Sequence, residues 1–400
     1  MPDPQLSLEA VLTSVNRAKG LPNPLYVDAR TAEQERQRVF FDHWAAIGHG
    51  KDIPEAGDAM PIDFLGEPLL ALRTRDGIEV FENVCRHRGM MLVQTKTKLR
   101  GAIRCPYHSW CYDLSGKLLS TPQVGGVGTH SHPDIDRGAL GLTRVRSFLW
   151  RDILFVNVSG TAPAFEEVHR DLMARWREFE GPLYPGSAES SFSLSVRCNW
   201  KLAVENYLES YHLPTVHARL NSYSPLSEHY NIAEYGKFAG QGTRTYRPTL
   251  DDAGRRFADV PGLSAQWDTG AEYLGLFPNV LLGVHRDHAF SIVLEPHGME
   301  STTERVEIYY ASPDMQGAEY AGLRAKNAGL WRAVFEEDVG VVEGMQRGRH
   351  ALHFDGGKLS PVMDEPTHVF HHWVASQLQA GSRPQAASQA QATSQPTPPS

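Results

Sequence analysis

The order of apolar and polar residues divides the chain into stretches with different periodicities. At residues 31–44, apolar residues follow a charged turn, which predicts a short helix that packs against the body of the protein. From residue 45 to residue 158, short runs such as AAIGH and RSFLWRDILFVNV alternate with turn residues, among them Arg75-Asp76-Gly77 and Leu114-Ser115-Gly116. These runs predict a small antiparallel β domain with hairpin turns.

A different pattern begins after the Pro- and Gly-containing segment at residues 160–163. It predicts helices at 166–180, 201–212 and 317–347, and strands at 191–200, 272–298 and 301–312. We therefore expect an α+β domain whose helices cover one side of an antiparallel sheet, in a helix-grip-like arrangement.

These patterns predict four parts: an N-terminal helical segment (1–44), the β domain (45–158), the α+β domain (159–378) and a tail (379–400). The tail consists mainly of Gln, Ala, Ser and Pro and has almost no large apolar side chains. We expect it to be disordered, because it cannot bury enough surface to offset the loss of chain entropy.

Composition narrows the class of protein. The 400 residues are 41% hydrophobic and 22% charged, as expected for an ordinary globular protein. A net charge of −8 gives no broad attraction for nucleic acid or an anionic membrane, so neither is an expected partner. The N-terminus lacks the basic-then-apolar order of a secretory signal, and no apolar run reaches about eighteen residues. A cytoplasmic enzyme is expected.

Two Cys/His pairs form the first candidate metal site. Cys85-Arg-His87 and Cys105-Pro-Tyr-His108 each place a cysteine shortly before a histidine, and the chain has only four cysteines. Two cysteines and two histidines fit tetrahedral zinc. They also fit a Rieske [2Fe–2S] cluster, in which two thiolates hold one iron and two imidazoles hold the other. The remaining cysteines, at positions 111 and 198, are expected to be small buried residues.

The sequence around these pairs favours the [2Fe–2S] cluster over zinc. Cys-Arg-His-Arg-Gly, Cys-Pro-Tyr-His-Ser-Trp and the following Tyr112-Asp-Leu-Ser-Gly-Lys-Leu resemble the Rieske fingerprint of the ring-hydroxylating oxygenase α-subunit family. The resemblance implies a [2Fe–2S] cluster on Cys85, His87, Cys105 and His108. Ser109 departs from the family, which usually has glycine there, and adds a side chain beside the cluster.

Basic residues lie between the two ligand loops and have two interpretations. They are either a docking patch for an acidic electron-transfer partner or ordinary solvated charges of a hairpin. The residues are Lys96, Lys98, Arg100 and Arg104.

A second candidate metal site lies near residue 212. His212 and His217 are five residues apart, which on an unbroken helix is about 140° of rotation and too wide for one metal. Pro214 lies between them and is expected to distort the helix, so that His217 approaches the same ion. Glu209 is three residues before His212 and is expected on the same helical face. Two histidines and a carboxylate form the facial triad of non-haem Fe(II) oxygenases.

The remaining ligand is implied by the resemblance. Asp338, in Phe-Glu-Glu-Asp-Val-Gly with Gln346 farther along, resembles the family's Glu–Asp motif, although Glu336 and Glu337 are competing carboxylates. In the family, an acidic residue at the position of Glu209 links a Rieske histidine of one subunit to an iron-bound histidine of the next. The resemblance thus implies that Glu209 bridges His108 and His212 between subunits of a homotrimer.

Asn-Tyr-Leu-Glu-x-Tyr-His around Glu209 is similar to the choline, carnitine and glycine-betaine monooxygenase branch. The resemblance implies a terminal oxygenase that uses dioxygen and electrons from NAD(P)H, delivered by a separate reductase or ferredoxin. It would hydroxylate or oxidatively demethylate a small organic substrate such as a quaternary ammonium compound. No Gly-x-Gly-x-x-Gly separates a strand from a helix, so the nicotinamide and flavin are expected on the partner.

Three other functions remain open from the sequence. They are an aromatic-acid ring hydroxylase, an electron-transfer Rieske protein without oxygenase activity, and a zinc-stabilised binding module. The aromatic candidates for substrate binding form either a cage for a cation or part of the ordinary core. The basic candidates form either a clamp for a carboxylate or ordinary surface charges. The aromatic candidates are Tyr207, Tyr211, Phe277, Phe290, Tyr309 and Tyr310, and the basic candidates are Arg244, Arg247 and Arg286.

Overall fold

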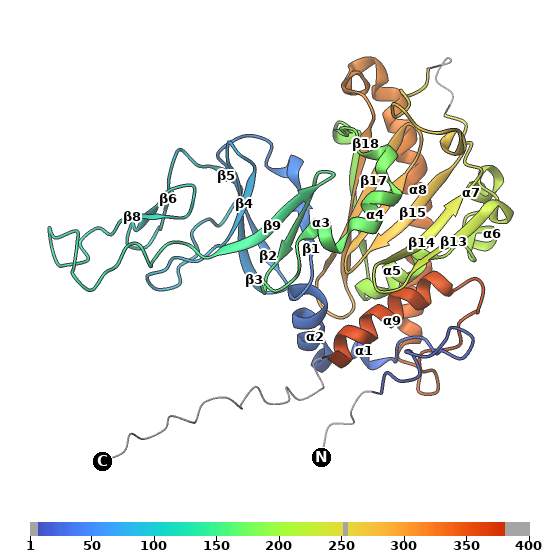
Figure 1. Cartoon of the computed structure of the whole chain (residues 1–400), viewed down its shortest axis with the longest axis horizontal. Coiled ribbons are helices and arrows are strands. Elements are labelled where there is room, and N and C mark those ends of the chain that lie inside the picture. The colour runs from blue at the N-terminus through green and yellow to red at the C-terminus, as the bar shows by residue number, and fades with distance from the viewer. Residues whose placement is uncertain (1–6, 251–254, 381–400) are drawn as a thin grey trace, which may run out of the picture.

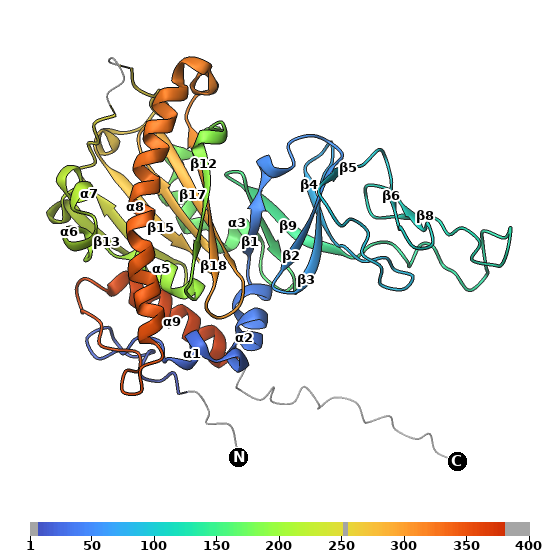
Figure 2. The same ribbon diagram turned by 180° about the vertical axis from the view of Figure 1, so that it is seen from behind.

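Two antiparallel β-sheets side by side form the framework of the molecule, and long helices cover the second sheet (Figures 1 and 2). This computed structural model describes residues 7–250 and 255–380. The predicted tail at 379–400 lies outside the described residues, except that its first two residues end helix α9 (Glu365–Ala380). The helix continues this far because its apolar face, which includes Phe370, Trp373 and Leu378, is buried.

The N-terminal segment is anchored on the second sheet's helices. It contains α1 (Pro24–Val27), α2 (Ala29–Glu35) and a π-helical turn (Arg36–Phe41). The predicted helix at 31–44 starts earlier than expected because the Asp28 side chain accepts the Arg30 backbone N–H and caps α2. The Phe40 ring meets the Trp200 ring edge-on, with 4.9 Å between centroids, so this part of the segment contacts helix α5 (Trp200–Leu208).

The first sheet has seven strands in the order β1-β10-β9-β4-β3-β2-β5, and a small sheet, β6-β7-β8, extends from it. The strands are β1 (Ala45–His49), β2 (Asp58–Phe64), β3 (Glu67–Arg73), β4 (Ile78–Glu82), β5 (Thr97–Lys98), β6 (Ile103–Arg104), β7 (Cys111–Tyr112), β8 (Leu118–Ser120), β9 (Arg144–Trp150) and β10 (Ile153–Asn157). The predicted turn at Gly116 requires glycine, since φ is +85° and a Cβ atom would lie 2.7 Å from the Phe81 ring.

The second sheet has eight strands, with seven in the order β11-β18-β17-β16-β15-β14-β13 and β12 paired to β18. The strands are β11 (Tyr184–Pro185), β12 (Ser191–Val196), β13 (His229–Glu234), β14 (Phe238–Thr243), β15 (Ala271–Leu276), β16 (Val280–Val284), β17 (His288–Pro296) and β18 (Thr302–Tyr310). Helices α5 (Trp200–Leu208), α8 (Ala321–Gly348) and α9 share one apolar core with this sheet.

The opposite face of the second sheet is also covered, which the sequence did not predict. Helices α3 (Phe165–Val168) and α4 (Arg170–Arg175) contribute to a separate core with β13–β17. The single helix predicted at 166–180 is interrupted at His169, whose backbone (φ −104°, ψ 14°) leaves the helical region while its side chain is buried against Phe165.

Polar contacts fix the two sheets to each other. The Asn279 side chain accepts the N–H of Ala46 and donates to its carbonyl, each at 2.9 Å. His49 contacts the Ser291 hydroxyl at 3.0 Å. These contacts tie β1 to the strands that carry the second sheet's core.

Candidate active site

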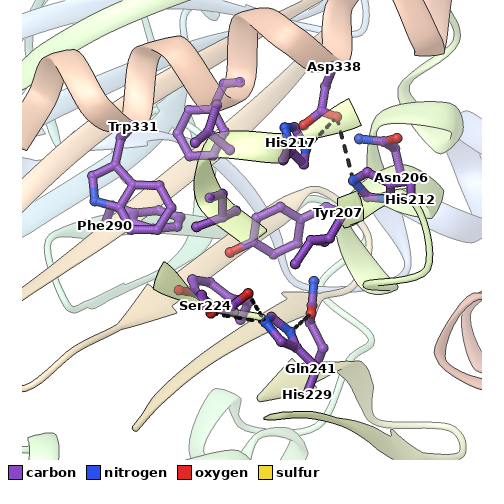
Figure 3. A pocket seen from close by; sticks show the side chains of 15 residues that line it. Asn206, Tyr207, His212, His217, Ser224, His229, Gln241, Phe290, Trp331 and Asp338 are labelled. Carbon is purple, nitrogen blue, oxygen red and sulfur yellow. Dashed lines mark hydrogen bonds and ion pairs between the residues drawn. The ribbon is translucent and has the colours of Figure 1, made fainter. Parts of the chain in front are cut away.

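Three side chains predicted as metal ligands converge under helix α8. One ligand atom each from His212, His217 and Asp338 lie within 4.8 Å of one another. Oδ1 of Asp338 is 3.0 Å from Nε2 of His217 and 3.7 Å from Nε2 of His212 (Figure 3). This oxygen is buried, and the two histidine nitrogens are the groups of the triad that lie near it. Two imidazoles and a carboxylate fit Fe(II).

The route of the chain to these ligands differs from the prediction. Helix α5 does not reach residue 212: it ends at Leu208, and Glu209 is extended (φ −116°, ψ 159°). His212 and His217 then flank the short helix α6 (Leu213–Val216), whose first turn contains Pro214. Proline is tolerated there because the first N–H groups of a helix have no partner. A separate one-turn helix, and not a distortion within α5, therefore brings the two histidines together.

Each of the two histidines has its own carboxylate partner. Nδ1 of His212 lies 2.6 Å from Glu209, and Nδ1 of His217 lies 2.7 Å from Glu337. A carboxylate accepts the proton on Nδ1 and leaves the Nε2 lone pair for a metal. Glu337 therefore lies behind His217 and not at the ligand position, and Glu336 is exposed. Of the three competing carboxylates, the structure brings Asp338 to both histidines.

A cavity with an empty volume of about 460 Å³, which includes space open to solvent, lies beside this triad (Figure 3). Its wall is largely aromatic, with Tyr207, Tyr273, Phe290, Trp331 and Phe335. Aliphatic side chains and four polar residues complete the lining. The polar residues are Asn206, Ser224, His229 and Gln241. Among the described lining residues, none is Lys or Arg, and Asp338 is the one carboxylate.

Two of the six predicted cage residues, Tyr207 and Phe290, line the cavity. The others do not: Tyr211 is exposed, and the remaining three are buried in packing contacts elsewhere, namely Phe277, Tyr309 and Tyr310. The sequence prediction missed Tyr273, Trp331 and Phe335. Trp331 and Phe335 are seven and three residues before Asp338, on the same face of α8, so helical spacing from the proposed ligand was a usable signal.

The indole of Trp331 is held by a buried chain of hydrogen bonds. Its Nε1–H donates to Nε2 of His288 at 3.0 Å, and Nδ1 of His288 lies 2.6 Å from Asp287. Because Nε2 accepts from the indole, Nδ1 carries the proton and donates to the carboxylate. This chain fixes the orientation of the largest aromatic side chain in the cavity.

The three predicted clamp arginines lie outside this cavity. Arg286 makes a two-pronged ion pair with Asp259, with contacts of 2.8 and 2.6 Å. Arg244 and Arg247 are exposed. Among the residues that the structure describes, no arginine therefore provides a clamp for a carboxylate in the cavity beside the triad.

The other candidate metal site is formed by two loops with the same backbone hydrogen bonds. The N–H of Cys85 donates to Met90, five residues on, and Cys85 accepts from Gly89. Cys105 repeats the pattern with Trp110 and Ser109, so the two loops share their backbone hydrogen bonds, although the histidine is two residues after the cysteine in one and three in the other.

The predicted cluster ligands come together in pairs, His87 with His108 and Cys85 with Cys105. The rings of His87 and His108 are 4.6 Å apart, and both cysteines are buried and free. Nδ1 of His108 is buried without a partner. Two thiols on one side and two imidazoles on the other are the donor set of a Rieske [2Fe–2S] cluster, so these residues fit that group.

A tyrosine hydroxyl supports the cluster loops. Tyr112 Oη lies 3.3 Å from Sγ of Cys85 and accepts the backbone N–H of Arg86 at 3.0 Å. Burial raises the pKa of Tyr112, so the phenol keeps its proton and would donate it to a Cys85 thiolate when a cluster is bound.

Ser109 occupies a backbone position that favours glycine. Its φ is +58°, and Gly89 at the equivalent position of the other loop has φ +73°. Left-handed backbone is unfavourable for a residue with a Cβ atom. The departure from the family at Ser109 is therefore a site of local strain.

The predicted docking residues Lys96, Lys98, Arg100 and Arg104 are all exposed. Lys98 pairs with Glu55 and lies 3.5 Å from Asp58, so it is at least partly engaged within the chain. A docking role for the group remains a prediction. Cys111 and Cys198 are buried, as expected.

Residues 174–380 match the family described as ring hydroxylating alpha subunit (catalytic domain), and residues 43–131 match the Rieske [2Fe-2S] domain. The chain belongs to the ring-hydroxylating oxygenase α-subunit family. As a Rieske oxygenase it is the terminal component of its system, carries a [2Fe–2S] cluster and a mononuclear iron, and needs a partner reductase or ferredoxin.

This Rieske oxygenase is similar to several proteins of known activity. It is 25% identical to the carnitine monooxygenase oxygenase subunit of Escherichia coli K12, over 84% of this chain and 86% of the relative. It is 27% identical to putrescine 2-hydroxylase of Ralstonia nicotianae, over 92% of this chain and 98% of the relative. A solved quaternary ammonium Rieske monooxygenase with γ-butyrobetaine has the same fold, with a TM-score of 0.73, 20% identity, and 94% and 100% coverage. In the described part of this oxygenase, no helix has the length and apolar character needed to cross a membrane.

Proposed function

We propose that this Rieske oxygenase oxidises a small amine with a cationic nitrogen, a quaternary ammonium compound first among them. The observation that carries the proposal is the lining of the cavity, which is aromatic and contains no Lys or Arg among the described residues. Aromatic faces attract ammonium groups, whereas an aromatic acid needs a cation for its carboxylate. Two relatives named for carnitine and putrescine support an amine substrate.

We further propose the metal ligands predicted from the sequence. Cys85, His87, Cys105 and His108 would hold the cluster, and His212, His217 and Asp338 would hold the iron. When bound, the cluster supplies single electrons and the iron supplies a site at which dioxygen is activated.

Glu209 is proposed as the link between the two metal sites of neighbouring subunits. Within the chain its carboxylate already contacts His212. The small sheet of β6 and β8, beside the cluster loops, lies at the end of the molecule farthest from α8 (Figures 1 and 2). An electron path inside one subunit would therefore be long. This supports the predicted homotrimer, in which His108 of one subunit would approach Glu209 of the next.

The protein side chains would orient the substrate and exclude water. The Tyr207 hydroxyl donates to the carbonyl of Leu282 at 2.8 Å, and the Trp331 indole donates to His288, so the polar atoms of both rings are occupied within the protein. Both rings are then fixed as apolar walls. A cation held against them would expose a carbon atom beside its nitrogen to the metal site.

The domain boundaries and the location are kept as proposals. We propose the divisions predicted at residues 44/45, 158/159 and 378/379, with β10 ending at Asn157 just before the middle one. A cytoplasmic location also remains a prediction.

A substrate screen with a generic reductase tests the function. Carnitine, γ-butyrobetaine, choline, glycine betaine, putrescine and benzoate would each be incubated with purified enzyme, and oxygen uptake and product would be measured together, since uptake alone can be uncoupled. We expect product from at least one amine and none from benzoate. Product from benzoate alone would overturn the proposed substrate class. His212→Ala should abolish product while the cluster keeps its visible absorbance, and retained turnover would overturn the iron assignment.

A further inference from the structure

The carbonyl of Glu209 is held by a side chain from the sheet. Gln241, on β14, donates from Nε2 to the Glu209 backbone oxygen at 3.1 Å. The last carbonyls of a helix lack intrahelical partners, and Glu209 directly follows α5. Gln241 therefore fixes the extended backbone from which the Glu209 carboxylate reaches Nδ1 of His212.

The orientation of Gln241 is fixed in turn by a histidine. Oε1 of Gln241 lies 2.6 Å from Nδ1 of His229, and Nε2 of His229 lies 3.0 Å from the Ser224 hydroxyl. A carbonyl can only accept, so the amide nitrogen of Gln241 must face Glu209 and its oxygen must face His229. Nδ1 of His229 then carries a proton, and Nε2 lies beside both the hydroxyl and, at 3.2 Å, the backbone carbonyl of Ser224. Burial lowers the pKa of His229, which favours the neutral ring.

The same side chains face the substrate cavity. Figure 3 shows Ser224, His229 and Gln241 as a hydrogen-bonded group across the cavity from the metal-binding triad. Gln241 and Ser224 are buried, and their polar atoms are used inside the protein. This group is therefore better suited to fixing the protein than to binding a polar group of the substrate.

We propose that Gln241, oriented by His229, is a positioning residue that sets the geometry of Glu209 and thereby the rate of electron transfer to the metal held by His212. The proposal rests on the proposed function of Glu209 as the link between subunits. Gln241 also lines the substrate cavity, but it contacts no proposed metal ligand, so its effect on electron transfer would be carried by the Glu209 backbone.

Four variants test this inference. Gln241→Met removes both hydrogen bonds at nearly constant volume, and His229→Phe removes the group that orients the amide. Gln316→Met is the matched control, because Gln316 makes the same kind of contact, from Nε2 to the Pro185 carbonyl at 3.0 Å, away from Glu209. Glu209→Gln tests the underlying role of the carboxylate.

Two measurements are made on each variant as the assembled enzyme with both metal centres. The first is the rate at which the dithionite-reduced cluster is reoxidised by dioxygen, followed by visible absorbance. The second is the electron paramagnetic resonance spectrum of the nitric oxide complex of the ferrous site, which reports the environment of His212 independently of turnover. We expect Gln241→Met to slow reoxidation about tenfold and to alter the nitric oxide spectrum, with a smaller change of the same sign for His229→Phe. Gln316→Met should match wild type.

The outcomes separate this inference from the proposal beneath it. If Glu209→Gln slows reoxidation and Gln241→Met leaves both the rate and the spectrum unchanged, the positioning role of Gln241 is wrong and the bridge stands. If neither variant slows reoxidation, the bridge itself is wrong. If Gln241→Met loses its iron or unfolds, His229→Phe decides, and a wild-type rate and spectrum in that variant overturn the inference.

Discussion

Nδ1 of His217 lies 2.7 Å from a carboxylate oxygen of Glu337, the residue directly before Asp338. Helix α8 thus contributes two neighbouring carboxylates with different tasks. Asp338 faces the Nε2 atoms of the histidines, and Glu337 orients one ring from behind.

Replacing Glu337 should therefore weaken iron binding. Partners of metal-binding histidines typically contribute 10–100-fold to affinity or activity, and we expect a loss of roughly this size for Glu337→Ala. Iron content after dialysis against a chelator and turnover with the substrate from the screen measure the effect. Glu336→Ala is the control, because this neighbouring carboxylate is exposed and the Nδ1 partner of His217 is Glu337. Equal losses in both variants would contradict the role of Glu337.

Trp331 should discriminate between a cation and its uncharged isostere. Loss of a cation–π contact costs about 1–2 kcal/mol in a desolvated site, so Trp331→Leu should raise KM for an ammonium substrate about tenfold. The analogue with carbon in place of nitrogen should lose much less. Steady-state kinetics with both compounds measure the difference. An equal loss for the two would show that Trp331 contributes shape and not charge recognition.

The strained backbone at Ser109 should be relieved by glycine. We expect Ser109→Gly to stabilise the protein by about 1 kcal/mol, because residues with a Cβ atom disfavour positive φ. The reverse change in the matching loop, Gly89→Ser, should destabilise by a similar amount, since no atom lies within 4 Å of a Cβ there and only φ matters. Thermal unfolding followed by cluster absorbance measures both. A lower midpoint for Ser109→Gly would mean that its hydroxyl makes a stabilising contact.

His169 should make the protein sensitive to acid. Burial lowers its pKa to about 4, whereas an unfolded histidine titrates near 6.5. Between these values the unfolded chain binds the extra proton, so stability is complete above about pH 6.5 and falls as the pH drops toward 4, by at most about 3 kcal/mol.

His169→Phe should remove this part of the pH dependence, since a phenyl ring is compatible with the aromatic contact to Phe165 and cannot be protonated. Midpoints of thermal unfolding at pH 5 and pH 7.5 should differ less in the variant than in wild type. An unchanged difference would assign the acid sensitivity to other buried histidines, such as His43 or His49.

The candidate metal ligands could be proposed from the sequence because they occur at short, characteristic spacings. Cys-x-His and Cys-x-x-His placed four donors on two loops, and the histidines around Pro214 suggested a shared ion. The reason given for the second site was nevertheless wrong, since α5 ends at Leu208 and a new helix begins at Leu213. Local propensity alone does not reveal where a helix stops when tertiary contacts hold its end.

The environment of the sites was much less predictable. Gln241 reaches Glu209 from a strand 32 residues later in the chain, and His288 reaches Trp331 across 43 residues. Such pairs depend on sheet register and on which helix covers which strand, and neither is encoded locally. Four of the six predicted cage aromatics proved to lie elsewhere for the same reason.

Helix α8 contributes Trp331 and Phe335 to the cavity wall and Asp338 to the ligand triad from one face of a single uninterrupted element of 28 residues. One residue inserted between Phe335 and Asp338 would rotate everything after it by about 100° while leaving the aromatic wall in place. The carboxylate would then point away from both histidines. Substitutions on the outer side of α8 are tolerable, but a change in its length is not, so natural variation in this segment should consist of replacements and never of insertions or deletions.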